Sequence, residues 1–453
     1  MIIVVLASFL TPFAGSSFNI ALPSIAEEFG LDAVTMSWAS LAYLLASAMF
    51  LVPLGRYADI HGRKRLFLLG NLCFALFSLL LGLYPSTQTI IALRVAQGVS
   101  SAMLFGTGVA ILVSVTPPKQ KGTALGVYSA SVYVGLSTGP FLGGFLTQVF
   151  GWRSILFATA GVGLTAALMV LLGMRGEWRE AAGESFDVAG SAVYSVVLLA
   201  LMYGLSLLPE LSGLLPIAIA LGGAWLFLVI EGKTPHPVFD IGLFRRNRVF
   251  TFSNLATLIN FSATYAVTFL LSAYLQYLKG LNPEDAGIIL MASPVVQAVF
   301  GPLAGRLSDR MDAKKVSAVG MGITVLGLVP FALIDGATPI AYVVGSLALL
   351  GLGLAVFSSP NTNVVMSSVE RKLYGTASST IATMRLAGQM LSMAVTLVIF
   401  SLLIGRLEIV PEVYPALLGS IRTAFIVFVA FCALGVLACL VNAGNGSAKS
   451  ESS

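Results

Sequence analysis

The chain has 453 residues, of which 57% are hydrophobic and only 10% are charged. Soluble proteins carry about 25% charged residues, so this composition excludes an ordinary soluble domain and indicates a chain embedded in lipid. The net charge of +5 does not indicate nucleic-acid binding, because the basic residues lie in short loops between apolar runs and not on one clustered face. The three cysteines, Cys73, Cys432 and Cys439, fall inside apolar runs and predict no disulfide.

Apolar runs long enough to cross a bilayer recur along the whole chain, where about 20 residues are needed per helix. In chain order the expected spans are residues 2–22, 36–54, 66–83, 89–114, 123–149, 155–172, 188–207, 213–230, 250–278, 286–303, 316–333, 340–366, 378–403 and 423–440. The sequence therefore predicts an all-α integral membrane protein with fourteen transmembrane helices and both chain ends on one side.

The loops differ strongly in charge. Of the 25 basic residues, nineteen lie in loops on one side, whereas only Arg153, Lys279, Arg406 and Arg422 lie on the other. Basic residues concentrate in cytoplasmic loops. We expect a multi-pass protein of the cell membrane with both termini in the cytoplasm.

The chain repeats itself at long range. Residues 53–59 (Pro-Leu-Gly-Arg-Tyr-Ala-Asp) return as residues 302–309 (Pro-Leu-Ala-Gly-Arg-Leu-Ser-Asp), and Gly122-Thr123-Ala124 returns as Gly375-Thr376-Ala377. Transporters are commonly built from such repeats, with a solute site near the midplane where the halves meet. The predicted division is a six-helix bundle over 1–175, two linker helices over 176–232, a second six-helix bundle over 233–442, and a disordered cytoplasmic tail over 443–453.

The loop after the second helix, residues 55–64 (Gly-Arg-Tyr-Ala-Asp-Ile-His-Gly-Arg-Lys), resembles the signature of the major facilitator superfamily, and the resemblance covers almost the whole chain. An aspartate here can accept hydrogen bonds from helix amides and pair with arginine, forming a latch that opens and closes as two bundles rock. The latch candidates are Gly55, Asp59, Gly62, Arg63, Gly305, Asp309 and Arg310. The chain departs from the family at Ile60, where a basic residue is usual. The alternative is that the basic residues of this loop only fix topology.

Two arginines lie inside expected helices. Residues 93–98 are similar to the family's second motif, and a buried Arg94 beside Gln97 must face the protein interior and be paired. Arg94 could tune a proton-accepting group or hold structure through carbonyls. Arg385, with Gln389 one turn later, falls near mid-bilayer, where it could face an anionic solute, pair with an acid, or be satisfied by carbonyls.

The fifth helix carries glycines and a proline at the spacing of the family's antiporter motif: Gly126, Gly135, Gly139, Pro140, Gly143 and Gly144. Glycines four residues apart line one face and allow close helix contact, and the proline can bend the helix. In the family this pattern accompanies exporters that exchange solute for protons, and fourteen helices imply the drug:proton antiporter (multidrug efflux) branch. Ordinary helix packing is the alternative.

An acidic residue inside a membrane span, which proton exchange would be expected to use, is missing from the sequence. The resemblance implies an acid in the first helix at the position of Ala14, and no Asp or Glu lies near the middle of any expected span. Proton coupling needs a group that gains and loses a proton. Either a carboxylate at a helix end serves, or the protein is a facilitator, or it couples to something else.

The leading prediction is a secondary transporter that exports amphipathic, drug-like solutes by alternating access, with protons as the exchanged ion; the alternative is a facilitator or symporter of an organic anion that uses Arg94 and Arg385. A channel lacks a visible filter, and a membrane enzyme lacks clustered ligands or acids. No enzyme activity, cofactor or metal is expected, and the chain is expected to act as a monomer. Polar residues inside spans are the candidates for solute binding: Asn19, Tyr43, Tyr128, Tyr133, Asn254, Asn260, Tyr265, Gln297 and Gln389.

Overall fold

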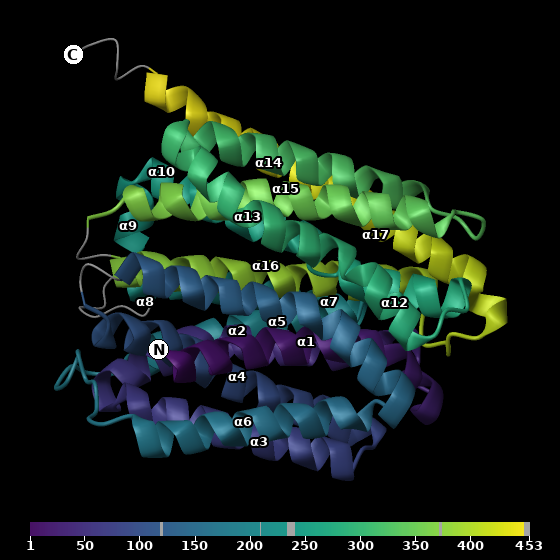
Figure 1. Ribbon diagram of the computed structural model, residues 1–453, viewed down its shortest axis with the longest axis horizontal. Helices are drawn as coiled ribbons and strands as arrows, with labels where there is room; N and C mark the ends of the chain where they lie inside the picture. Colours follow the sequence, from purple (N-terminus) through teal and green to yellow (C-terminus); the bar gives the residue numbers. More distant parts are fainter. Residues whose placement is uncertain (118–120, 209, 233–240, 371–373, 448–453) are drawn as a thin grey trace.

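The computed structural model describes residues 1–117, 121–208, 210–232, 241–370 and 374–447 (Figure 1). Over these residues the prediction of an all-helical chain is confirmed, because long helices run side by side and the extended structure amounts to one isolated bridge between Asp32 and Glu408. The first six helices are α1 (Ile2–Phe29), α2 (Ala33–His61), α3 (Arg63–Leu83), α4 (Thr87–Val115), α5 (Lys121–Phe150) and α6 (Arg153–Gly173).

Two further helices, α7 (Val188–Ser206) and α8 (Leu214–Glu231), precede the second large group. That group is α9 (Ile241–Arg246), α10 (Arg248–Thr264), α11 (Val267–Ala273), α12 (Pro283–Leu290), α13 (Ala292–Arg310), α14 (Ala313–Leu328), α15 (Ile340–Ser367), α16 (Tyr374–Leu403) and α17 (Tyr414–Ser447). In Figure 1, α1 to α6 lie below and the helices from α10 onward lie mainly above. We call α1 to α6 the N-terminal group and α10 to α17 the C-terminal group.

Thirteen helical stretches of the described chain are long and apolar enough to cross a membrane. The sequence predicts fourteen spans, and the remaining one, residues 123–149, falls on α5, a 30-residue helix in which several side chains lie outside the described residues. At the other end of the chain, α17 continues to Ser447, into the segment predicted as a tail. Residues 441–447 contain no proline, the residue that most strongly ends a helix.

Two predicted helices are interrupted in the structure. The predicted span 250–278 breaks after Thr264, where the amide of Ala266 donates to the Ser392 hydroxyl of α16 (3.0 Å) and not to its own helix. The predicted span 286–303 divides at Met291. Pro294 follows in the first turn of α13, where its missing N–H is tolerated.

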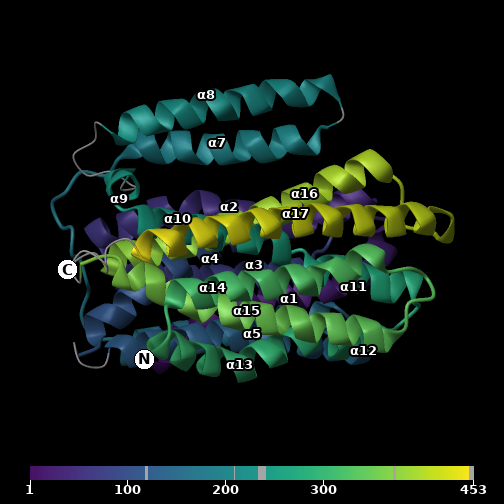
Figure 2. The same ribbon diagram turned by 90° about the horizontal axis from the view of Figure 1, so that it is seen from above.

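The helices α7 and α8 lie together at one edge of the molecule (Figure 2). They are attached to α2 by two hydrogen bonds, from Tyr194 Oη to the Ala48 carbonyl (3.1 Å) and from Ser195 Oγ to the Met49 carbonyl (3.2 Å). Ser401 of α16 donates to the carbonyl of Leu208 (2.7 Å). The pair therefore touches both groups of helices through α2 and α16.

The helices run between two opposite ends of the molecule, the terminal face and the far face. The terminal face is the end at which α1 begins, α2 turns into α3, and α17 ends. The far face is the opposite end, where α1 turns into α2 and α11 leads into α12.

Candidate solute path and its gates

The Arg94 side chain is the largest fully buried side chain in the described protein, with 1% of its surface exposed. Its Nε donates to the Ala39 carbonyl (3.0 Å) and its Nη1 to Gln97 Oε1 (3.1 Å). The guanidinium lies between two aromatic rings, 4.2 Å from the centroid of Phe18 and 4.3 Å from that of Tyr43. Carbonyls and aromatic faces thus balance this cation, since it forms no ion pair within the described residues. Arg94 therefore ties α1, α2 and α4 together.

Three of the predicted solute contacts gather beside Arg94. Asn19 accepts a hydrogen bond from Ser40 (2.8 Å), and Tyr43 donates to the Thr11 carbonyl (3.2 Å). Tyr265 reaches them from the other group of helices: a Cβ placed on Gly15 would lie 3.5 Å from the Tyr265 hydroxyl and 3.7 Å from the Tyr43 ring. Because Tyr265 sits at the break between α10 and α11, the interrupted helix brings a phenol of the C-terminal group against α1.

Arg385 has a different environment. It projects from α16 with its guanidinium carbon 5.1 Å from the centroid of the Phe261 ring of α10. Its Nε is buried without a hydrogen-bond partner in the described residues. Tyr128 of α5 lies within electrostatic range of it. Arg385 is therefore half-buried between the two groups, with its polar atoms incompletely paired.

Other predicted contacts do not join these clusters. Asn260 Nδ2 lies 3.4 Å from Met321 Sδ within the C-terminal group, and Asn254 donates to the Phe250 carbonyl of its own helix (2.8 Å). Gln389 is buried one turn beyond Arg385. Tyr133 and Gln297 are half-buried, and their side chains form no hydrogen bond within the described residues.

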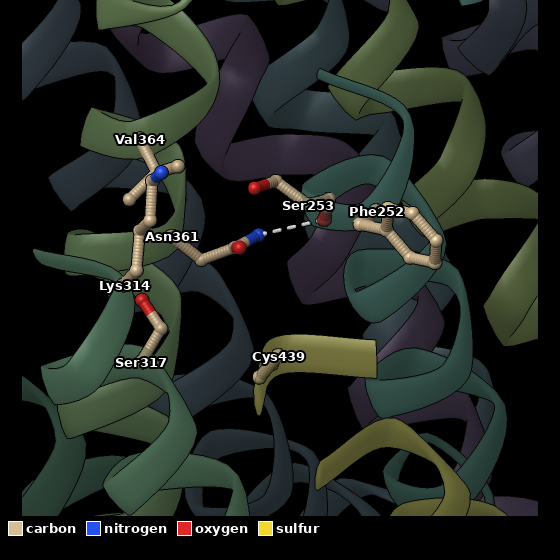
Figure 3. Close-up of a pocket in the computed structure, with 7 residues that line it drawn as sticks. All are labelled: Phe252, Ser253, Lys314, Ser317, Asn361, Val364 and Cys439. Carbon is tan, nitrogen blue, oxygen red and sulfur yellow. Dashed lines mark hydrogen bonds between the residues drawn. The ribbon is translucent and has the colours of Figure 1, made fainter. Parts of the chain in front are cut away.

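Two of the small hollows in the described protein lie in different groups of helices. One is inside the C-terminal group, where Asn361 donates to the Ser253 carbonyl (3.0 Å) near Lys314 (Figure 3). The second lies between α1, α3, α4 and α5, and Thr11 and Tyr128 are among its lining residues. Only the second contains a predicted contact residue.

The glycines of α5 allow this helix to pack very closely against α1. A Cβ on Gly135 would lie 2.5 Å from the Phe9 carbonyl oxygen, and one on Gly139 would overlap Ser16. A Cβ on Gly143 would lie 2.7 Å from that of Ser17. The predicted glycine face is therefore a packing surface against α1. Gly126 belongs to α5, but its contacts lie outside the described residues.

The same helix also touches the other group at the far face. A Cβ on Gly144 would lie 2.3 Å from the Pro283 carbonyl oxygen of α12, and one on Gly287 of α12 would lie 2.3 Å from the Pro140 carbonyl oxygen. The small residues of α5 thus serve two contacts, one within its own group and one across to α12.

Several hydrogen bonds join the two groups at this same end. Gln276 donates to the Ile20 carbonyl (3.0 Å) and Tyr277 to the Pro23 carbonyl (3.3 Å). The amide of Ala33 donates to the Leu407 carbonyl (3.2 Å), next to the isolated bridge between the α1–α2 and α16–α17 loops. These three hydrogen bonds from the C-terminal group or to it lie near the far face. In the described structure this face is closed.

At the terminal face, the predicted latch residues of the first half are paired within that half. Arg63 Nε donates to Asp59 Oδ1 (2.6 Å), and its two Nη atoms reach Glu180 at 2.7 and 2.9 Å. Only 7% of the Arg63 side chain is exposed. Gly62 has φ +132°, and a Cβ there would lie 2.6 Å from the Glu177 carboxyl carbon. The positive φ and the short distance to Glu177 both favour glycine at position 62, because a side chain there would be strained and would overlap the carboxylate.

Residues 174–187, between α6 and α7, supply these acids, and we call them the acidic strap. Arg56 pairs with Glu184, and the Lys64 amide donates to Glu177 (2.7 Å). Backbone bonds add to this, because the Ala181 amide donates to the Asp59 carbonyl (3.0 Å). The sequence analysis did not identify the strap acids. Their only signal in the sequence is that three glutamates, Glu177, Glu180 and Glu184, lie close together in the segment after α6.

The repeated loop in the C-terminal group is held differently. Ser308 donates to the Gly305 carbonyl (2.7 Å), and Asn363 approaches the Ser308 hydroxyl (3.4 Å). Arg310 ends α13 on the surface. The Asp309 side chain lies outside the described residues.

Comparison with known protein families assigns this architecture to one of them. The sequence profile of the Major Facilitator Superfamily matches residues 4–393 and also residues 255–451. The chain belongs to the Major Facilitator Superfamily. It is thus a multi-pass membrane transporter of small solutes and not an enzyme, and the family predicted from the loop and helix motifs is confirmed.

Relatives of this superfamily member include transporters of different solutes. The riboflavin transporter RibZ of Clostridioides difficile is 30% identical over 392 residues, which is 85% of this chain and 84% of the relative. The multidrug resistance protein Stp of Mycobacterium tuberculosis is 29% identical over 83% of this chain and 71% of its own. The tetracenomycin C resistance and export protein of Streptomyces glaucescens is 29% identical over 79% of this chain and 67% of its own.

Solved structures agree with the fold. A bacterial homologue of the human lysosomal transporter Spinster, in an inward-facing and unoccupied conformation, matches with a TM-score of 0.71 at 17% identity, covering 97% of this chain and 95% of that one. The nucleoside transporter NupG matches with a TM-score of 0.64 at 14% identity, covering 97% of this chain and 98% of that one. At these identities the likeness concerns the major facilitator fold alone.

Proposed function

We propose that this protein exports amphipathic organic solutes across the cell membrane by alternating access. The observation that carries the proposal is the meeting of Asn19, Tyr43 and Tyr265 between the two groups, beneath a far face closed by Gly144 and Gly287. A mostly aromatic, amide-containing contact region suits amphipathic compounds bound loosely. The drug-resistance and export relatives point to the same class of activity.

The proposal includes a topology. The chain crosses the membrane fourteen times as one monomer, with a bundle over 1–175, linker helices over 176–232, a bundle over 233–442 and a tail over 443–453. The terminal face is cytoplasmic, since its loops carry nineteen of the basic residues. In this orientation the closed far face is the outer gate.

The proposal also specifies the coupling ion. Exchange for protons is proposed because of the glycine and proline spacing of α5. The described helices carry their acids at or near their ends, and Asp59 is already paired with Arg63. A carboxylate at a helix end must therefore carry the proton. Placement in the multidrug branch depends on the same spacing and on the fourteen crossings.

A transport assay in everted membrane vesicles tests these statements. Uptake of ethidium, riboflavin and fluorescein is followed with an imposed pH gradient, acid inside, and after nigericin has removed the gradient. We expect uptake of at least one compound to exceed that of vesicles lacking the protein and to collapse with nigericin. Unchanged uptake would exclude proton exchange, and uptake no greater than in control vesicles for every compound would exclude the exporter.

A facilitator or symporter of an organic anion is the second candidate. It is favoured by Arg94 and Arg385, neither of which forms an ion pair within the described residues. This candidate predicts that fluorescein alone enters the vesicles. Nigericin should leave its uptake unchanged for a facilitator and raise it for a proton symporter, because the acid interior drives a symported anion outward.

A further inference from the structure

The two interior arginines are not equivalent. Arg94 is almost completely buried, donates through Nε and Nη1, and lies between the rings of Phe18 and Tyr43. Arg385 is half-buried, its buried Nε has no hydrogen-bond partner in the described residues, and it contacts one ring at a longer distance. Arg94 is therefore occupied by its own protein, whereas Arg385 retains a donor for another molecule.

Arg385 is also placed where a transported solute must pass. It follows the start of α16 by eleven residues, which corresponds to about 16 Å at 1.5 Å per residue, or half of a bilayer core. Phe261 belongs to its own group, whereas Tyr128 comes from α5 of the opposite group. The guanidinium thus lies at half-depth between the two groups that move in the proposed cycle.

A cation at this depth needs compensation, because charge in a membrane interior is costly unless it is paired. No carboxylate lies at half-depth in the described helices. The Phe261 ring covers one side of the guanidinium, and Tyr128 lies within electrostatic range of it. Tyr128 also lines the hollow between α1, α3, α4 and α5, where the Thr11 hydroxyl is buried without a partner in the described residues.

We propose that Arg385 is the anion-binding residue of the solute path and that the bound solutes are aromatic compounds carrying one carboxylate or sulfonate group. The guanidinium binds the anionic group in a forked arrangement, and the rings of Phe261 and Tyr128 contact the aromatic part. This inference rests on the proposed transport function and defines its solute class.

Binding to the purified full-length protein tests the proposal. The probes are naphthalene-2-sulfonate, the neutral naphthalene-2-sulfonamide and 2-naphthylmethylammonium, measured by titration calorimetry in detergent. The variants are Arg385→Gln, Arg385→Lys and, as a matched control, Arg406→Gln, because Arg406 is exposed in a far-face loop. Losing a charge-assisted hydrogen bond should weaken sulfonate binding about 10- to 100-fold in Arg385→Gln.

The neutral probe reports whether the site is intact, so its Kd should stay within about twofold in all variants. Arg385→Lys keeps the positive charge and should still prefer the sulfonate to the sulfonamide. Should Arg385→Gln fail to elute as a single species, this preference in Arg385→Lys decides the question. Sulfonate binding that is unchanged in Arg385→Gln, or wild-type binding of the ammonium probe as tight as that of the sulfonate, would overturn the proposal.

The same probes in vesicles separate this inference from the proposed function. If the sulfonamide or the ammonium compound is transported and the sulfonate neither binds nor moves, the anion site is wrong and the exporter stands. If the sulfonate binds in an Arg385-dependent way but no probe is transported, the site stands and the proposed function is wrong.

Discussion

Gly144 of α5 and Gly287 of α12 form a reciprocal backbone contact across the far face. Each position faces a carbonyl oxygen of the other helix, from Pro283 and Pro140 respectively, at 2.3 Å from the site of a Cβ. Ordinary contact with a Cβ begins at 3.4 Å. Neither position can therefore accept a side chain while the far face is closed as described.

Substitution of Gly144 by alanine is the first prediction. The helices must separate by about 1 Å, which should destabilise the closed far face by about 1–3 kcal/mol, as overpacking usually does. A spin-label pair at Glu27→Cys and Asp285→Cys should then report a larger population of long distances. Gly161→Ala is the control, because a Cβ there meets nothing within 4 Å. Identical distance distributions in Gly144→Ala and wild type would contradict the assignment of this contact as a gate.

The glycine contact also illustrates what the sequence can predict. The four-residue spacing of Gly135, Gly139 and Gly143 indicates a close-packed face because helix geometry is local. It does not indicate which helix lies against that face, since this depends on contacts between residues more than 100 positions apart. The structure shows that α1 covers the face and that Gly144 instead meets α12.

Other differences between the predicted and the observed structure also arise from contacts between residues that lie far apart in the sequence. The break at Tyr265 depends on the Ser392 hydroxyl of α16, which lies 126 residues away in the sequence. No local signal marks that break, because the segment contains neither proline nor glycine. The acidic strap likewise looks like an ordinary polar loop until the fold places Glu180 on Arg63. Arg94 and Arg385, in contrast, could be found from the sequence because charge inside apolar runs is rare.

The acidic strap gives the second prediction. Glu180→Gln removes one partner of Arg63, but 62% of the Glu180 side chain is exposed, so the free energy of unfolding should fall by only about 0–1 kcal/mol. The local effect should be larger. Hydrogen exchange of the Ala181 amide, which donates to the Asp59 carbonyl, should accelerate as the strap loosens.

Arg63→Gln should accelerate the same exchange further, because it also removes the partner of Asp59. Arg179→Gln is the matched control on the strap, since Arg179 is exposed and forms no ion pair within the described residues. Equal protection of Ala181 in Glu180→Gln and Arg179→Gln would show that the carboxylate does not hold the strap.

The third prediction compares lysine substitutions at the two interior arginines. Arg94→Lys keeps the charge but loses the planar group between Phe18 and Tyr43, so we expect a stability loss of about 2 kcal/mol. Arg385→Lys should cost less than about 1 kcal/mol, because Arg385 forms no hydrogen bond within the described residues. Thermal unfolding of the ligand-free proteins in detergent measures both. A larger loss for Arg385→Lys would reverse the structural roles assigned to the two residues.

The fourth prediction concerns hydroxyls at the far face. Tyr277 donates to the Pro23 carbonyl across the two groups (3.3 Å), whereas Tyr342 donates to the Pro330 carbonyl within the C-terminal group (3.2 Å). Each hydrogen bond should contribute about 0.5–1.5 kcal/mol, so removing either hydroxyl should change overall stability similarly. Only Tyr277→Phe removes a bond that exists when the far face is closed and is absent when it opens. With the Glu27→Cys and Asp285→Cys spin labels, Tyr277→Phe should therefore raise the open population up to about tenfold and Tyr342→Phe should leave it unchanged. An equal shift in both variants would mean that these bonds act on folding and not on the gate.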